Sequence, residues 1–187
     1  MSAKLIVLDI NGLLVYKSFT KNNQNTSLNT IKLNSYNVDI RPHYKEFLEF
    51  CYTYATVGFL SSTNKMNVDK ILKHILTTEQ KKNTLFVWSR DRTHFDNTND
   101  NTNCNNSIET IKKLSDVWDN PVVNEYRTFN DTNTLIIDDS AIKLRFNDAK
   151  NVLICSTFDN SKPNSKPDTH LIDLVDMIKE KFDAMQD

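Results

Sequence analysis

Asp9 is the carboxylate of this chain with the clearest chemical setting, because it follows the apolar run at residues 4–8. A carboxylate at the end of a strand can attack phosphorus and form an acyl-phosphate that water later hydrolyses. Two positions on, the chain has Asn11, an amide that cannot exchange a proton as a second acid would. An aspartate after a strand more often forms a turn or caps a helix. The residue pattern alone leaves both interpretations of Asp9 open.

Two further acids, Asp138 and Asp139, end the apolar run TLIIDDS. When an anion attacks a phosphate ester, the charge must be compensated, and Mg²⁺ held by one or two carboxylates can do this. A lysine can also neutralise phosphoryl oxygens, and Lys112 and Lys113 precede the acid pair. An acid pair after a strand and a lysine on a helix are each common without function. Their occurrence together with Asp9 favours a phosphate site with a metal ion.

The elements that must position these residues are short apolar strands alternating with amphipathic helices. Apolar runs predict strands at residues 4–8, 13–16, 38–40, 57–62, 85–89, 134–140 and 151–156. Helical periodicity predicts helices at residues 43–55, 67–76, 107–118 and 171–182, with Ser107 as a cap. The polar segment 17–35 is predicted to be a loop or a mobile hairpin tip, and segments 97–106 and 160–168 are predicted to be loops.

This alternation predicts an α/β fold with a mainly parallel sheet. In such sheets, reactive groups lie beyond the carboxyl ends of the strands. Ser61 and Ser62 end the predicted strand at 57–62. We therefore expect these two hydroxyls to lie at the same edge as Asp9 and the acid pair. The charged segment 90–94 could also bind phosphate there, although an ordinary loop is the simpler interpretation.

Length and composition limit the remaining choices. The 187 residues suit one domain, spanning 1–187, and the net charge of -1 gives no strong nucleic-acid or membrane signal. Cys51, Cys104 and Cys155 have no CxxC spacing and are expected to be reduced thiols. With no secretory leader or membrane-spanning run, we expect a cytoplasmic or nuclear protein.

Five motifs occur in the same order as in a known group of enzymes. They are DINGL, VDIRPHYKEFLEF, VGFLSSTNKMNVDKIL, KKLSDVW and LIIDDS. Over residues 5–158 the chain resembles the haloacid dehalogenase superfamily, and within it the phosphatases that act on the C-terminal domain of RNA polymerase II. This group includes the small CTD phosphatases, and the variant with Asn in the signature is similar to its plant and protist members. The resemblance implies a Rossmann-like fold with flanking helices and a small β-hairpin insert after the first strand.

The resemblance also implies roles for individual residues. Asp9 would be the nucleophile, and Lys112, rather than Lys113, would stabilise the phosphate. The backbone carbonyl of Asn11 would complete a Mg²⁺ site. The implied sets are catalytic Asp9, Asn11 and Lys112; phosphate-binding Ser61, Ser62 and Lys112; and metal-binding Asp9, Asn11, Asp138 and Asp139.

Three departures from the family pattern leave two functions open. Asn11 replaces the general acid and base, Leu13 replaces the signature threonine, and Leu60 aligns with a family hydroxyl. The first function is a Mg²⁺-dependent phosphatase acting on phosphoserine or phosphothreonine in proteins. The second is a pseudophosphatase that binds a phosphorylated protein or peptide, or serves as a scaffold. A phosphatase for a small molecule or a nucleic-acid end is a weaker alternative.

Overall fold

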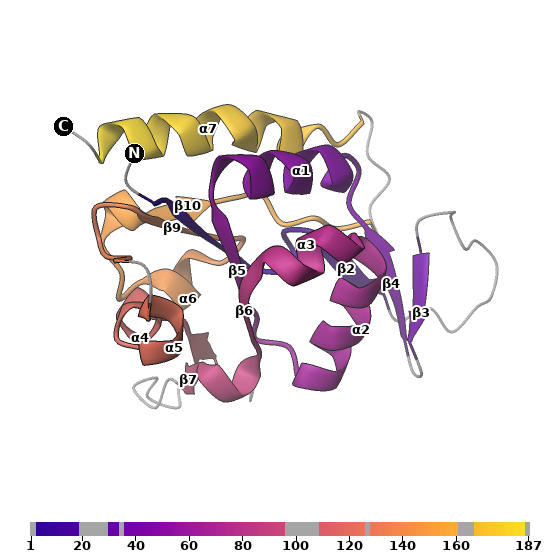
Figure 1. The fold of residues 1–187 in the computed structure, drawn as a ribbon. Helices are drawn as coiled ribbons and strands as arrows, with labels where there is room; N and C mark the ends of the chain where they lie inside the picture. The colour runs from indigo at the N-terminus through magenta and orange to yellow at the C-terminus, as the bar shows by residue number, and fades with distance from the viewer. Residues whose placement is uncertain are drawn as a thin grey trace, which may run out of the picture.

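Five parallel strands form the central sheet of the computed structural model, which describes residues 3–18, 30–33, 36–95, 109–125, 128–160 and 167–185 (Figure 1). The strand order is β10-β9-β1-β5-β6. The bounds are β1 Leu5–Leu8, β5 Thr56–Leu60, β6 Thr84–Trp88, β9 Thr134–Asp138 and β10 Val152–Ile154. The predicted α/β fold with a mainly parallel sheet is confirmed.

Side chains of β1 alternate between two apolar layers, one on each face of the sheet. Ile6 and Leu8 belong to one buried cluster, and Leu5 and Val7 belong to the other. This alternation is the period of a strand, and a central parallel strand is buried on both faces. All four side chains are fully buried, which explains why this stretch is a continuous apolar run.

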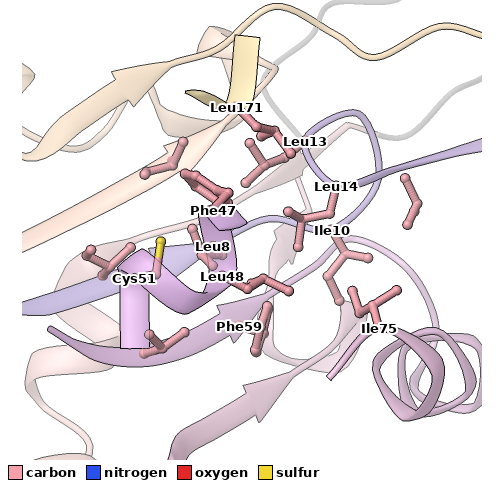
Figure 2. Packing of buried hydrophobic residues seen from close by; sticks show 14 of the residues in the cluster. Leu8, Ile10, Leu13, Leu14, Phe47, Leu48, Cys51, Phe59, Ile75 and Leu171 are labelled. Atoms are coloured by element: carbon pink, nitrogen blue, oxygen red, sulfur yellow. The ribbon is translucent and has the colours of Figure 1, made fainter. Parts of the chain in front are cut away.

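Helices cover both faces of the sheet. On one face lie α1 (Tyr44–Tyr54) and α7 (His170–Ala184), which pack against each other (Figure 1). The short helices α4 (Leu114–Trp118), α5 (Pro121–Asn124) and α6 (Ala141–Leu144) contribute to the other cluster. Figure 2 shows the first cluster, where Phe47 and Cys51 of α1 approach Leu8.

The sequence predicted these helices through their apolar stripes. In α7 the stripe at Leu171, Leu174, Ile178 and Phe182 is buried. In α2 (Lys65–Ile75) the buried stripe follows a cap, in which the Asn64 side chain accepts a hydrogen bond from the backbone N–H of Asn67. The sequence analysis missed α3 (Thr78–Asn83), which begins with a capping box.

The insert after β1 is an antiparallel sheet with the order β2-β4-β3. Its strands are β2 (Val15–Ser18), β4 (Tyr36–Ile40) and β3 (Thr30–Leu33). A small β insert is therefore confirmed, and of the two alternatives for 17–35 a plain loop is wrong where β2 and β3 form. Buried Ile31 and Val38 explain the pairing, since they anchor these polar strands in the core. The rest of that loop, 19–29 and 34–35, lies outside the described residues.

The predicted helix over 107–118 is wrong at its beginning. Thr110–Ile111 form β8, which pairs with β7 (His94–Phe95), and the helix starts only at Leu114. Both residues of β8 are buried, and β-branched side chains suit a strand in that position. Ser107 and the predicted loop at 97–106 lie outside the described residues, as does most of the segment 160–168.

Two smaller expectations concern cysteines and membranes. Cys51 and Cys155 are buried free thiols, while Cys104 lies outside the described residues. Across the described ranges, none of the helices combines the length and apolar character that a membrane crossing requires. The remaining short elements are the 3-10 helices η1 (Arg90–Arg92) and η2 (Ala149–Asn151).

Candidate functional site

The carboxyl ends of β1, β5 and β9 meet at one edge of the sheet. β1 lies between β5 and β9 and pairs in parallel with both. The chain continues from β5 to β6 on one side and from β9 to β10 on the other, so β1 is next to a switch point in strand order. Ligands of open α/β sheets bind in the crevice at such a point. Asp9, Ser61 and Asp138 come from these three strand ends.

Lys112 joins two of these strand ends. Its Nζ donates to Asp9 Oδ1 at 2.7 Å and to Asp138 Oδ2 at 2.5 Å. The side chains of Lys112 and Asp138 are 0% exposed, and that of Asp9 is 2% exposed. A buried charge of this kind needs partners, because burial without them is very costly. The structure therefore brings together three of the predicted site residues.

Lys112 lies in the connection between β8 and α4, and backbone contacts hold it there. Its N–H donates to the carbonyl of Lys143 at 2.9 Å. The Asn147 side chain donates to the carbonyl of Lys112 at 2.8 Å and accepts from the N–H of Leu114 at 2.7 Å. The sequence analysis missed Asn147, and an asparagine at this spacing carries no recognisable motif.

Burial and the neighbouring charges have opposing effects on the pKa values of Asp9, Asp138 and Lys112. Burial raises the pKa of Asp9 to about 6, with a further contribution from Asp138 and an opposing one from Lys112. Burial would also raise the pKa of Asp138, but Lys112 and Lys143 hold it below its ordinary value. The two carboxylates raise the pKa of Lys112 despite its burial. Lys112 and Asp138 are therefore charged at neutral pH, and Asp9, with a pKa of about 6, is mostly ionised there as well.

The donor set fits a divalent cation. Asp9, Asp138 and Asp139 each offer a carboxylate oxygen, and these atoms lie within 4.8 Å of one another. Asp139 Oδ1 is buried and has no hydrogen-bond partner among the described residues. Oxygen ligands from carboxylates are those that Mg²⁺ prefers. A buried carboxylate oxygen without a hydrogen-bond partner is the kind of group that a metal ion would satisfy.

Gly12 allows the acid pair to approach the loop after β1. It has a φ of +90°, and a Cβ placed there would lie 2.1 Å from Asp139 Oδ2. Only glycine adopts this backbone readily and leaves room for the carboxylate. Gly12 also receives the N–H of Phe158 on its carbonyl at 2.7 Å. Gly12, one of two glycines in the sequence, is therefore needed because it leaves space for the Asp139 carboxylate.

Replacing Gly12 by alanine should displace Asp139 and strain the backbone. We expect Gly12→Ala to lower the free energy of unfolding by about 1–3 kcal/mol and to weaken Mg²⁺ binding. Urea unfolding and isothermal titration with Mg²⁺ measure the two effects. Gly58→Ala is the matched control, because its Cβ would meet the Phe86 ring within the sheet. It should lose stability but keep Mg²⁺ binding; equal Mg²⁺ affinity in both variants would contradict this role for Gly12.

A pocket of about 260 Å³, the central pocket, reaches the cluster at Asp9. Its lining includes Asp9, Asn11, Ser61, Ser62, Thr63, Asn64, Arg90 and Lys143, with Lys17, Tyr36 and Val38 from the insert. The sequence analysis missed Lys143, whose Nζ lies 3.8 Å from Asp138 Oδ1 and 3.9 Å from Asp139 Oδ1. Lys143 lies on α6, four residues after Asp139, and this i,i+4 spacing is the only feature of the sequence that could have predicted its place beside the acid pair. Arg90 belongs to the segment for which an ordinary loop was the simpler interpretation.

The three departures from the family pattern lie in different surroundings. Asn11 is exposed and lines the central pocket. Its neighbours close the loop, because the Gly12 N–H donates to the Val15 carbonyl and the Val15 N–H donates to the Ile10 carbonyl. Neither bond uses the carbonyl of Asn11. Leu13 is fully buried in the core, among the side chains of Figure 2.

The neighbouring serines occupy two distinct positions after β5. Leu60 is buried in the second apolar cluster, whereas Ser61 and Ser62 line the central pocket. The Ser61 side chain is itself buried, and its N–H donates to the carbonyl of Trp88 at 3.0 Å. The hydroxyls at this strand end therefore come from Ser61 and Ser62.

Arg41 ties the loop after β1 to the C-terminal part of the chain. Its Nε donates to Asp168 at 2.9 Å, and its NH1 donates to the carbonyls of Leu13 and Ser156 at 3.2 and 2.9 Å. Its side chain is 2% exposed. Guanidinium can make these contacts together because its donors lie in a fixed plane. Arg41 thus supports the loop that carries Asn11 without lining the pocket.

A lysine at position 41 would keep the charge but could not keep all of these contacts. We expect Arg41→Lys to lower the free energy of unfolding by about 2–3 kcal/mol, measured by urea denaturation. Arg92→Lys is the control, because Arg92 is exposed and lies over the Trp88 ring. Equal urea midpoints for the two variants would contradict the supporting role.

The fold and the cluster together define a class of protein: an α/β protein with a buried aspartate–lysine–aspartate cluster at the carboxyl edge of its sheet. The sequence model of the NLI interacting factor-like phosphatase family matches residues 4–187. The chain belongs to this family, which confirms the resemblance to the phosphatases of the polymerase C-terminal domain.

Individual relatives agree with this assignment. An uncharacterized FCP1 homology domain-containing protein of Schizosaccharomyces pombe is 25% identical over 184 residues, covering 94% of this chain and 70% of that protein. Two solved structures of the RNA polymerase II CTD phosphatase Fcp1 share the fold with a TM-score of 0.55, at 12% and 14% identity. The first is the fission yeast R271A variant bound to beryllium fluoride. The match covers 98% of this chain but about half of the Fcp1 chains, at 51% and 49%.

Proposed function

We propose that this protein is a Mg²⁺-dependent phosphatase that uses Asp9 as its nucleophile on phosphoserine or phosphothreonine in proteins. The observation that carries this proposal is the buried Lys112, which contacts Asp138 and also Asp9, a residue that lines the central pocket. Membership of a phosphatase family and the fold shared with Fcp1 support a phosphorylated protein as the substrate. We still expect this protein to be cytoplasmic or nuclear, and a phosphorylated protein substrate agrees with that expectation.

Each residue of the site has a role in this proposal. Asp9 attacks the phosphorus, while Lys112 compensates the charge of the phosphoryl oxygens. Ser61 and Ser62 donate hydrogen bonds to those oxygens from the end of β5. The metal would be held by Asp9, Asp138, Asp139 and the carbonyl of Asn11, and would supply further charge compensation at the phosphoryl group.

Asn11 limits the rate of this reaction. It lines the central pocket and, by the family resemblance, stands where an acid would protonate the leaving alcohol and later activate water. An amide does neither, and the loss of general acid and base help costs about 10²–10⁴-fold in rate. The same observation favours the second candidate function, a pseudophosphatase whose pocket binds a phosphorylated protein without turning it over.

Hydrolysis of an aryl phosphate distinguishes the two functions. An aryl phosphate has a good leaving group, so it depends less on the missing acid. We expect slow, Mg²⁺-dependent release of phosphate that falls by at least about 10³-fold in Asp9→Asn, since removal of a nucleophile eliminates the covalent route. Asp183→Asn is the control, because Asp183 is exposed on α7. Equal rates for wild type and Asp9→Asn would eliminate the phosphatase proposal.

A further inference from the structure

A second hollow, the flanking groove, opens beside the central pocket. Ser62, Arg90 and Lys143 line both hollows, so the two are adjacent. The flanking groove has a volume of about 240 Å³, and Glu109, Thr110 and Ile142 add to its lining. A substrate with its phosphate in the central pocket can therefore place a neighbouring group in the flanking groove.

The wall between the two hollows is fixed by hydrogen bonds. The hydroxyls of Ser62 and Thr110 lie 2.5 Å apart, and Arg90 Nε donates to the Ser62 carbonyl at 2.7 Å. Thr110 is buried and belongs to β8, which pairs with β7. These contacts hold the flanking groove in shape without a ligand, which favours binding because little ordering is needed.

Glu109 supplies a hydrogen-bond acceptor that the described part of the chain does not use. Its Oε2 is buried and has no hydrogen-bond partner there. Buried polar atoms are nearly always paired in folded proteins. Lys143 already lies beside the acid pair, and Arg90 is exposed, so water can satisfy its remaining N–H groups. The buried group without a partner is therefore an acceptor, which an incoming donor would satisfy.

Ile142 adds an apolar surface to the same groove. It is 46% exposed on α6, although it is a large aliphatic side chain. A lysine or arginine has an aliphatic stem that packs on apolar surface and a cationic head that donates to a carboxylate. Glu109 and Ile142 together match both parts of such a side chain.

We propose that the flanking groove is a specificity subsite for a lysine or arginine next to the phosphorylated residue of a protein substrate. Glu109 accepts a hydrogen bond from the cationic head, and Ile142 packs against the stem. The inference rests on the proposed function, because it takes the phosphate to occupy the central pocket.

Matched phosphoserine peptides test the subsite. One series carries a single lysine one, two or three positions before or after the phosphoserine, and the other carries norleucine at the same place. We expect the best lysine peptide to exceed its norleucine counterpart by about tenfold in kcat/KM, since a hydrogen bond to a charged group is among the stronger ones. Glu109→Gln should remove most of this ratio, and Glu109→Lys should bring it below one, so that the norleucine peptide is preferred.

The controls separate this inference from the proposed function. Glu46→Gln makes the same change at an exposed residue of α1 that lines neither hollow, and it should keep the lysine preference. If wild type releases no phosphate even from an aryl phosphate, the proposed function fails, and fluorescence anisotropy with the same peptides then measures the preference as affinity. A lysine-to-norleucine ratio near one at every position would overturn the subsite. A lysine-to-norleucine ratio that is unchanged in Glu109→Gln would overturn the subsite as well.

Discussion

Asn11→Asp is expected to raise phosphate release by about 10²–10⁴-fold, the usual contribution of a general acid and base. The new carboxyl would stand in the central pocket, where Asn11 is already exposed beside Asp9. It could then protonate the leaving alcohol and afterwards take a proton from the attacking water. The measurement is kcat for an alkyl phosphate such as phosphoserine peptide, because a poor leaving group depends most on the acid.

The size of the gain also tests the other two departures from the family pattern. Leu13 and Leu60 are both buried in apolar clusters and line neither pocket nor groove. Ser61 and Ser62 remain at the strand end, so we expect only the acid to be missing. Asn11→Ser is the control, since it removes the amide without adding an acid. A rate for Asn11→Asp no higher than for Asn11→Ser would favour the pseudophosphatase.

Sequence reasoning predicted the part of the site that depends on strand ends. Buried parallel strands are apolar runs, and the first polar residues after them must lie at one edge of the sheet. Asp9, Ser61 and Asp138 were located by this rule: Asp9 and Ser61 line the central pocket, and Asp138 shares the Lys112 ammonium with Asp9. The rule uses only periodicity and chain direction, both of which a single sequence contains.

Residues placed by loops could not be found in this way. Lys112 was predicted on a helix, yet it lies in a connection that Asn147 and the carbonyl of Lys143 hold in place. The burial of Lys112 depends on the two carboxylates that it contacts, which come from distant segments. Glu109 likewise has no distinctive neighbours in the sequence. Its significance comes from a hollow that α6 and β8 form only in the folded chain.

Lys112→Met is expected to lower the free energy of unfolding by about 3–5 kcal/mol, because it leaves two buried carboxylates without their shared cation. Methionine keeps much of the length and apolar volume of the lysine stem, so a packing defect should contribute little. Lys143 cannot replace the lost ammonium, since its Nζ is 3.8 Å from Asp138 and approaches the other oxygen of that carboxylate. Urea denaturation measures the loss.

The adjacent lysine provides a matched control for this prediction. Lys113 is only partly buried and lies over the exposed Phe146 ring, so Lys113→Met should stay within about 0.5 kcal/mol of wild type. The double variant Asp9→Asn with Lys112→Met should recover part of the stability, because one of the two uncompensated charges is then absent. Additive losses in that double variant, or similar losses for the two lysines, would contradict the shared ion-pair cluster.

Phosphate release in Lys112→Met should fall as well, by about 10²–10³-fold, because the phosphoryl oxygens lose a preorganised cation.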